Sequence, residues 1–186
     1  MNSMKERTKL MFANAILEIV AKKDLSKIRI SELCEYCGTD RQTFYYHFKD
    51  KYDLVTWIYE EDLERSFEQY DNYFSKDQTR LLLEQIQEKH FFYRKAFEDT
   101  NQNSLFSYMR AANCRITKDI LKHHLQTDEL TEEQCFSVNY HSYAWVCCLS
   151  EWLKNRCEPE LDVYVDYLYD NSMVIYERHP FQKETK

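Results

Sequence analysis

The chain has 186 residues, with one glycine, Gly38, and only two prolines. That composition leaves few residues for the tight turns of a multi-stranded sheet, so the sequence predicts an all-α fold. A net charge of −7 argues against a nucleic-acid coat protein or a membrane-surface binder. No stretch approaches the roughly 20 apolar residues that cross a bilayer, and the N-terminus MNSMKERTKL lacks the apolar core of a signal peptide, so we expect a cytoplasmic protein.

The charge is unevenly distributed along the chain. Residues 1–60 hold ten Lys and Arg against nine Asp and Glu, whereas residues 61–186 hold fifteen against twenty-three. The acidic character therefore belongs to the second part of the chain.

Apolar periodicity predicts a series of helices joined by short connections. Gly38 is placed to stop one helix, because glycine adopts the left-handed conformation at no steric cost, and Asp40 and Asp50 are placed to cap the helices that follow them. The predicted helices span residues 4–23, 30–37, 41–48, 51–74, 77–97, 104–126, 131–156 and 160–178.

The second and third of these helices are short and joined by a turn that contains Gly38. With a first helix packed across both, this arrangement is the helix-turn-helix, whose second helix enters the major groove of DNA. In the segment RQTFYYHF, Phe44 and Phe48 stand four positions apart and are expected to point inward, which leaves the polar residues outside.

The outward residues of this segment have side chains suited to DNA. Arg41 can bind guanine and Gln42 can bind adenine through paired hydrogen bonds, and Thr43 shares the first turn with them. The residues that come next carry hydroxyl, imidazole and ammonium groups, which can bind phosphate; they are Tyr45, Tyr46, His47, Lys49 and Lys51. Either tyrosine taken alone is more often a packed aromatic than a DNA contact, so the prediction depends on the spacing of the whole set.

The stretch ISELCEYCGTDRQTFYYHFKDKYDL resembles the TetR family of bacterial transcription regulators, and the resemblance covers residues 8–55. It implies an N-terminal helix-turn-helix domain over residues 1–52 and a helical regulatory and dimerisation domain over residues 53–186. The positions that commonly touch DNA in the family correspond here to Asp40, Arg41, Gln42, Thr43, Tyr45, Tyr46, His47 and Lys51.

Three positions depart from the family pattern. One is Gln42, which replaces a small residue and so favours readout of DNA by its side chain over a close approach of the backbone. Asp24 stands where the family usually has glycine, and we expect aspartate to tolerate the left-handed conformation there. Arg29 stands where a threonine usually caps the second helix, so the side-chain cap is lost, but Arg29 could bind phosphate beside that helix N-terminus.

The C-terminal segments FYRKAFEDTNQNSLFSYM and HSYAWVCCLSEWLKN resemble the subgroup of regulators of dihydroxyacetone kinase operons. Family membership implies a homodimer through the last two helices and a variable effector domain. The large apolar residues of the last two helices are too many for one covering layer, and a four-helix interface would use them. They are Val138, Tyr140, His141, Tyr143, Ala144, Cys147, Cys148, Trp152, Val163, Tyr167, Met173, Val174 and Tyr176.

An effector pocket could lie among the preceding helices, and the alternative is that their aromatic residues are simply core. The candidate lining residues are Phe91, Phe92, Tyr93, Phe97, Phe106, Tyr108 and Tyr140. The effector would be a small molecule or a protein, and its different affinities for two dimer geometries would change operator binding.

Cys34 and Cys37 have the spacing of a zinc or redox pair, but a structural zinc site needs four ligands and no second pair is suitably spaced. The adjacent pairs His123-His124 and Cys147-Cys148 each point about 100° apart on a helix. We therefore expect structural thiols and no cofactor or metal, with a redox switch as the alternative for this pair.

An enzyme is not expected, because a chain with one glycine lacks a phosphate-binding loop, a zinc-protease motif and a nucleophile elbow. The sequence instead predicts a regulator that binds a near-palindromic operator as a homodimer. The remaining alternative is a helical adaptor that controls a partner protein without binding DNA.

Overall fold

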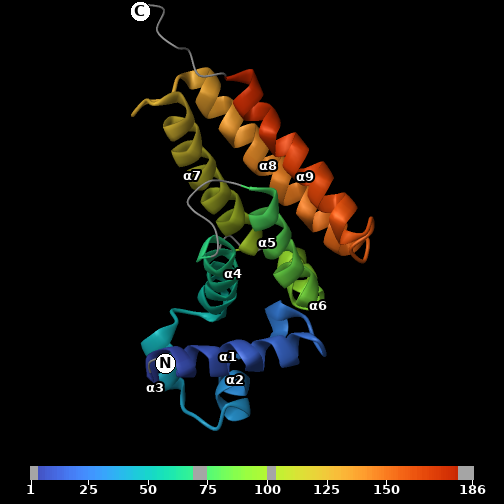
Figure 1. Ribbon diagram of the computed structural model, residues 1–186. Coiled ribbons are helices and arrows are strands. Elements are labelled where there is room, and N and C mark those ends of the chain that lie inside the picture. The colour runs from blue at the N-terminus through green and yellow to red at the C-terminus, as the bar shows by residue number, and fades with distance from the viewer. Residues whose placement is uncertain (1–3, 69–74, 100–103, 180–186) are drawn as a thin grey trace, which may run out of the picture.

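The computed structural model describes residues 4–68, 75–99 and 104–179, and within these ranges the chain is helical without a strand. Figure 1 shows α1, α2 and α3 at one end of the molecule, α7, α8 and α9 at the other, and α4, α5 and α6 between them. The all-α prediction is confirmed. The elements are α1 (Met4–Val20), the 3-10 turn η1 (Leu25–Lys27), α2 (Ile30–Tyr36), α3 (Arg41–His47), α4 (Lys51–Glu68), α5 (Lys76–Glu88), α6 (His90–Glu98), α7 (Leu105–Leu125), α8 (Glu132–Lys154) and α9 (Leu161–Arg178).

The turn between α2 and α3 is built as the sequence predicts. Gly38 has a φ of +62°, and the Thr39 N–H donates to the Cys34 carbonyl at 2.9 Å, which closes the end of α2. The Asp40 carboxylate accepts from the Thr43 N–H at 2.7 Å and so caps α3. Asp50 caps α4 in the same way, since it accepts from the N–H groups of the second and third residues of that helix at 2.8 and 2.9 Å.

The core of the N-terminal unit is aromatic. Phe12 of α1 is fully buried, and its ring meets those of Phe44 and Phe48 edge-on, at centroid distances of 5.1 and 6.4 Å. Both α3 phenylalanines therefore point inward as predicted. Cys34 is also buried, and Cys37 is half-buried with its thiol 3.7 Å from the Met11 carbonyl, so both cysteines pack within this unit.

The expected left-handed conformation at Asp24 is wrong. Asp24 has φ −65° and ψ 142°, which is extended backbone open to any residue. The chain leaves α1 through backbone bonds from Lys22 and Lys23 to the Ile19 carbonyl, at 3.0 and 3.2 Å, and reaches η1 without a residue of positive φ. No glycine is needed at this turn.

One predicted helix, residues 77–97, is two. The chain breaks at Lys89, whose φ of −105° and ψ of 24° separate α5 from α6. A buried carboxylate of α4 lies beside the break: Asp62 accepts from Lys89 Nζ at 2.6 Å and from the Tyr93 hydroxyl at 2.5 Å. The Gln85 amide donates to the Asp62 backbone carbonyl at 2.9 Å, so three groups from both helices meet one residue.

The other boundaries differ from the predictions by a few residues, as fraying ends do. The last six residues of the predicted helix 51–74 lie outside the described residues. No helix in the described ranges is long and apolar enough to cross a membrane.

Candidate nucleic-acid interface

Helix α3 presents its polar side to solvent because its apolar side is taken up by the core. Arg41 and Gln42 are exposed in its first turn, and Tyr45 and Tyr46 are 49% and 74% exposed. Two tyrosines this exposed are not packed aromatics, which removes that alternative. Thr43 is half-buried in the same turn.

Cationic side chains surround the exposed aromatic rings. The Arg41 guanidinium lies 5.9 Å from the centre of the Tyr45 ring and donates to the Tyr45 hydroxyl at 3.4 Å. Lys5 of α1 places its ammonium group 5.8 Å from the centre of the Tyr46 ring. The outer side of α3 therefore combines aromatic area with positive charge, although the chain as a whole is acidic.

Arg29 is exposed at the N-terminus of α2 and makes no side-chain cap there, as expected. It lines a shallow hollow together with Ser31 and Arg41, between the starts of α2 and α3. The fold thus brings Arg29 beside the first turn of α3, from a position twelve residues earlier in the sequence.

His47 lies at the end of α3 with its Nδ1 atom buried and, within the described residues, without a hydrogen-bond partner. Burial lowers the pKa of His47, and the nearby positive charges of Lys5 and Lys9 lower it further. A neutral imidazole is therefore favoured at neutral pH in the free protein.

A second exposed surface lies at the other end of the molecule, on α8 and α9. On α8 its residues recur at spacings of three and four, with Tyr143 next to Ala144 and Cys147 next to Cys148, and on α9 they recur at spacings of four and seven, so each set lies on one side of its helix. The residues of this α8–α9 face are Phe136, Tyr140, Tyr143, Ala144, Cys147, Cys148, Val163, Tyr167 and Val174.

Not all the apolar residues expected on this face reach it. Val138 and Trp152 are buried within the chain, and His141, Met173 and Tyr176 are half-buried. Phe136, at 72% exposure, belongs to the face although the sequence analysis did not include it. Its position four residues before Tyr140 is the signal that could have found it.

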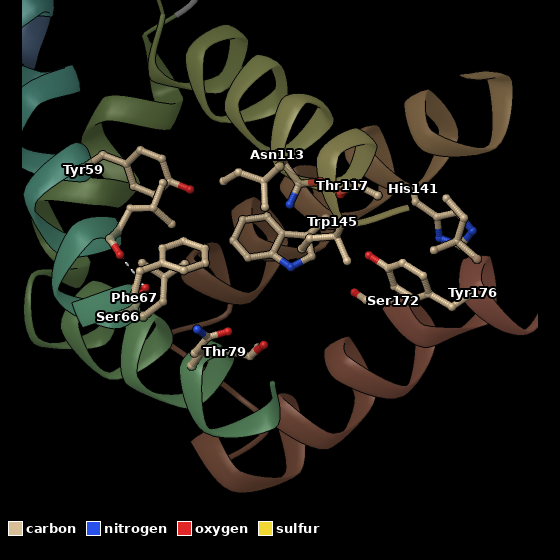
Figure 2. A pocket seen from close by; sticks show the side chains of 16 residues that line it. Tyr59, Ser66, Phe67, Thr79, Asn113, Thr117, His141, Trp145, Ser172 and Tyr176 are labelled. Atoms are coloured by element: carbon tan, nitrogen blue, oxygen red, sulfur yellow. Dashed lines mark hydrogen bonds between the residues drawn. The ribbon is translucent and has the colours of Figure 1, made fainter. Parts of the chain in front are cut away.

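A cavity lies between α4, α5, α7, α8 and α9, and Figure 2 shows side chains from each of these helices around it. Each of the five helices contributes side chains to the lining; one from each, in chain order, is Tyr59, Thr79, Asn113, Trp145 and Tyr176. The space open to the centre of a water molecule is about 50 Å³.

The seven residues predicted to line an effector pocket are not among those that line this cavity. Phe92 and Tyr93 are fully buried core residues, and Phe97 and Phe106 pack against that core. The Tyr108 hydroxyl donates to the Glu60 carboxylate, and burial with that bond raises the pKa of Tyr108 to about 12.

Tyr140 is 64% exposed, because its neighbour His141 points into the cavity and adjacent helical residues diverge by about 100°. Phe91 is 55% exposed on α6. The aromatic content of α6 and α7 is therefore mostly core, which was the stated alternative.

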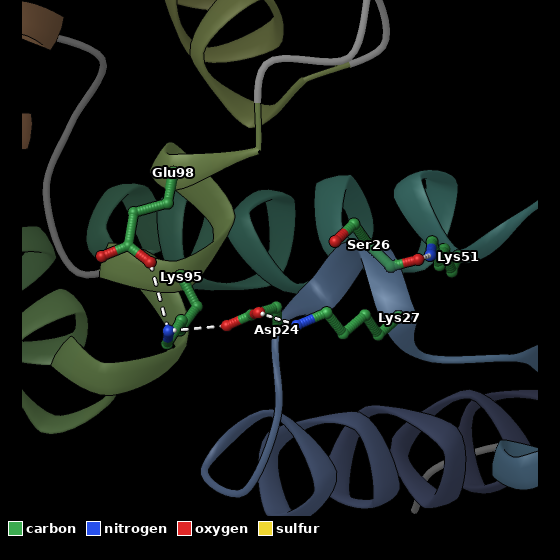
Figure 3. Close-up of polar contacts among 6 residues, drawn as sticks. All are labelled: Asp24, Ser26, Lys27, Lys51, Lys95 and Glu98. Carbon is green, nitrogen blue, oxygen red and sulfur yellow. Dashed lines mark hydrogen bonds and ion pairs between the residues drawn. The ribbon is translucent and has the colours of Figure 1, made fainter.

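Lys51 has a role that the sequence analysis did not assign. Its ammonium group donates to the backbone carbonyls of Leu25, Ser26 and Ile28 at 2.8, 2.8 and 3.0 Å, and Figure 3 shows the bond to Ser26. All three N–H bonds are thus directed at the loop around η1, and burial lowers the pKa of Lys51. Lys51 ties the start of α4 to this loop, in place of the expected free charge beside DNA.

The N-terminal unit also contacts α6 directly. Lys95 lies between Asp24 and Glu98, 2.9 and 3.3 Å from their carboxylates, as Figure 3 shows. Hydrogen bonds from Lys27 and Lys95 lower the pKa of Asp24 to about 2. The Tyr52 hydroxyl adds a bond of 3.1 Å to Asp99 at the end of α6. Helix α6 therefore holds the first part of the chain together with α4, whose Trp57 ring packs against that of Phe48.

Comparison with known proteins agrees with this architecture. Residues 14–56 match the family described as bacterial regulatory proteins, tetR family, and residues 75–173 match a transcriptional regulator C-terminal region of the same family. The dhaKLM operon transcriptional activator DhaS of Lactococcus lactis is 28% identical over 91 residues, which are 48% of this chain and 49% of that protein. The chain thus aligns with about half the length of this curated relative.

Two solved structures share the fold. A dihydroxyacetone kinase operon activator DhaS has a TM-score of 0.67 and 18% identity, over 95% of this chain and 98% of the other. A TetR regulator from Rhodococcus sp. RHA1 has a TM-score of 0.57 and 14% identity, over 90% and 97%. Regulators of this family are not enzymes, in line with the sequence analysis. The chain belongs to the TetR family of bacterial transcriptional regulators.

Proposed function

We propose that the protein binds operator DNA by inserting α3 into the major groove. The observation that carries this proposal is the outer side of α3, where two exposed tyrosines lie among Arg41, Gln42 and Lys5 on an otherwise acidic protein. In helix-turn-helix proteins the N-terminal residues of the recognition helix contact base edges. Arg41 and Gln42 hold that position here.

Each predicted DNA residue has a role in this proposal. Arg41 reads guanine and Gln42 reads adenine, while Arg29, Thr43, Tyr45, Tyr46 and His47 bind phosphates. Asp40 acts by capping α3, since a free carboxylate would repel phosphate. Lys51 acts by fixing the loop before α2, because its three donors are engaged there.

The protein acts as a homodimer through the α8–α9 face. A self-complementary interface places the same patch of both copies against each other, and an apolar face formed by two neighbouring helices suits a four-helix contact. Two α3 helices related by a two-fold axis would read a near-palindromic operator. Residues 1–52 then form the DNA-reading domain and residues 53–186 the regulatory and dimerisation domain, in the cytoplasm.

Operator binding responds to an effector, either a small molecule or a protein. The cavity supports the choice of a small molecule as the effector, because α7 and α8, which line it, also pack against α6, and α8 carries part of the α8–α9 face. The names of the relatives add the proposal that the target operon encodes a dihydroxyacetone kinase.

A mobility-shift assay with DNA from upstream of the protein's own operon tests this function. We expect a retarded complex that survives an excess of shuffled competitor DNA and weakens steeply with salt, because Lys and Arg side chains displace counterions. A chain that shifts specific and shuffled DNA alike, or shifts neither, would contradict the proposal. The second outcome would favour the adaptor alternative.

A further inference from the structure

The cavity between α4 and α9 contains two hydrogen-bond donors that have no acceptor. Gln78 and Trp145 are 4% and 6% exposed, and within the described residues neither the Gln78 Nε2 atom nor the Trp145 Nε1 atom has a partner. Both residues line the cavity. A buried donor without an acceptor costs about 1–3 kcal/mol, so such groups call for an explanation.

The orientation of the Gln78 amide is fixed by the helix that carries it. Gln78 is the third residue of α5 and completes a capping box: its Oε1 atom accepts from the Ser75 N–H at 3.0 Å, while the Ser75 hydroxyl accepts from the Gln78 N–H at 3.1 Å. With the oxygen held at the helix end, the NH₂ group is left on the cavity side. Reversing the amide would break the capping box, so the donor cannot be exchanged for the acceptor.

The Trp145 indole lines the cavity, and its nitrogen is itself buried. Figure 2 shows the ring in the middle of the cavity, with its nitrogen facing the side of Ser172 and Tyr176. The hydroxyl groups of the lining donate to helix carbonyls, and although each keeps acceptor lone pairs, none of them accepts from the Gln78 or the Trp145 nitrogen within the described residues. Ser66 donates to Leu63 at 2.6 Å, Thr79 to Ser75 at 3.1 Å and Ser172 to Leu168 at 2.7 Å.

The described lining carries no formal charge. It includes no Asp, Glu, Lys or Arg, and its one histidine, His141, has its pKa lowered by burial and then by Arg178 and His179. Burial raises the pKa of Tyr176 to about 12, so its phenol is also neutral. A charged ligand would lose its hydration here and find no counter-charge, which costs several kcal/mol.

The size of the cavity limits the ligand. The space open to the centre of a water molecule is about 50 Å³, whereas a single water needs about 10–15 Å³ of such space. The space therefore exceeds one water and suits a molecule of a few non-hydrogen atoms, held by apolar side chains and a small number of polar groups.

We propose that this cavity binds a small uncharged molecule whose oxygen accepts hydrogen bonds from the Gln78 amide and the Trp145 indole. The ligand class is thus a neutral carbonyl or hydroxyl compound. This inference rests on the proposed function in one respect only, that such a ligand would be the effector. Binding itself is a property of the free protein and is tested without DNA.

The chain offers a direct spectroscopic test, because its three tryptophans give three indole N–H resonances. The probes are the neutral acceptors cyclohexanone and 2-pyrrolidone, the anion cyclohexanecarboxylate and the cation cyclohexylammonium. The Trp145 resonance, identified by its absence in Trp145→Phe, should move saturably with the two neutral probes. The Trp152 resonance is the internal control, since that indole already donates to the Pro159 carbonyl at 2.9 Å and should stay in place.

Two variants sharpen the test. Trp145→Phe keeps the aromatic ring and removes the donor, so the affinity for cyclohexanone should fall by about 3- to 10-fold, the value of one hydrogen bond. Gln78→Glu keeps the oxygen of the capping box and replaces the donor by a second oxygen. Its affinity for the neutral probes should therefore fall at least about as much as that of Trp145→Phe. The two charged probes should bind the parent protein at least about 100-fold more weakly than cyclohexanone.

The proposal is overturned if neither neutral probe moves the Trp145 resonance saturably, which would indicate a cavity that holds water only. It is also overturned if a charged probe binds as well as cyclohexanone, or if both variants bind cyclohexanone as the parent does. The mobility-shift assay run beside these titrations keeps the two ideas apart. Specific DNA binding without probe binding refutes the ligand class and leaves the proposed function standing, whereas probe binding without DNA binding does the reverse.

Discussion

Two regions at opposite ends of the molecule expose aromatic side chains, and they differ in what surrounds the rings. On α3, Tyr45 and Tyr46 are 49% and 74% exposed, and on the α8–α9 face Phe136 and Tyr140 are 72% and 64% exposed. Exposure alone therefore does not separate the two regions. The difference is charge: cations lie over both α3 tyrosines. On the α8–α9 face, within the described residues, one ring has such a neighbour, Tyr143 with Arg110 at 4.9 Å.

This difference suggests two kinds of partner. Aromatic and cationic groups together bind a polyanion, because hydroxyl groups and positive charges both meet phosphate oxygens. Aromatic and aliphatic groups without charge bind another apolar surface, for which a second copy of the same face is suited. Changes that exchange these properties should therefore affect one region and spare the other.

The largest effect is expected from a charge placed in the α8–α9 face. Tyr140→Asp should destabilise a dimer by about 6 kcal/mol, because a two-fold axis buries the unpaired carboxylate twice at about 3 kcal/mol each. Sedimentation equilibrium should show a monomer. Tyr36→Asp on α2, where the tyrosine is 57% exposed, is the matched control and should remain dimeric. A Tyr140→Asp protein that still dimerises as the parent does would exclude this face as the interface.

Removal of the guanidinium at the start of α3 should have the next largest effect. Arg41→Ala should weaken operator binding by about 1–3 kcal/mol and relax the preference at one base pair, as expected for a bidentate contact with guanine. Fluorescence anisotropy with single-base operator variants measures both changes. Arg115→Ala, which removes an exposed arginine from α7, should leave the affinity unchanged. Equal affinities for the Arg41 and Arg115 variants would remove Arg41 from the reading set.

Two neighbouring lysines should have different roles, Lys49 in DNA binding and Lys51 in the stability of the fold. Lys51→Met should lower the free energy of unfolding by about 1.5–3 kcal/mol, because its ammonium group bonds three carbonyls. Lys49→Met, at an exposed position, should stay within about 0.5 kcal/mol of the parent in stability but reduce the salt dependence of DNA binding. Urea unfolding and salt titrations measure the two quantities. If Lys51→Met reduced the salt dependence of DNA binding and left the stability unchanged, Lys51 would instead be a DNA contact.

The smallest effect is expected from the pH dependence of His47. Its pKa is lowered in the folded protein, so in the window just below the ordinary value of about 6.5 the unfolded chain binds more protons. Stability should therefore be complete above that pH and fall as the pH decreases through it. His47→Gln should flatten this part of the curve, with His141→Gln as the comparison, since its pKa is lowered as well.

If His47 also contacts phosphate, the negative charge would raise its pKa in the complex, and operator binding would take up a proton. Affinity for DNA should then increase as the pH falls through about 6.5, in the opposite direction to stability. Operator affinity measured at several pH values, with and without His47→Gln, distinguishes the two contributions. The same slope in both proteins would show that His47 does not face DNA.

The helix-turn-helix could be predicted from the sequence because its signals are local. Gly38, Asp40 and Asp50 each act on residues within four positions, and the structure places all three as expected. The bond between Lys89 and Asp62 at the break could not be predicted, since the two residues are 27 positions apart in the chain. Lys51 was assigned to DNA for the same reason: its partners are 23 to 26 residues earlier in the chain.

The cavity was the least accessible to prediction. The aromatic residues of α6 were predicted to line a pocket, but an aromatic residue follows the same sequence pattern whether its ring lines a cavity or fills a core. Gln78 carried a signal that could have been used, because Ser75-Lys76-Asp77-Gln78 has the spacing of a capping box. That pattern fixes where the amide oxygen is held and hence which way the donor points. The missing partner of Trp145 depends on five helices and has no local signal.

Selection of binding sites from a random pool of double-stranded DNA tests the central claim most directly, because the pool samples every candidate operator sequence at once. The account predicts enrichment of one near-palindromic sequence by the parent protein, with two half-sites about one helical turn or a multiple apart. It also predicts that Arg41→Ala loses the preference at symmetric positions in both half-sites. No enrichment over the starting pool, or enrichment that is the same for Arg41→Ala, would contradict the claim that α3 reads DNA.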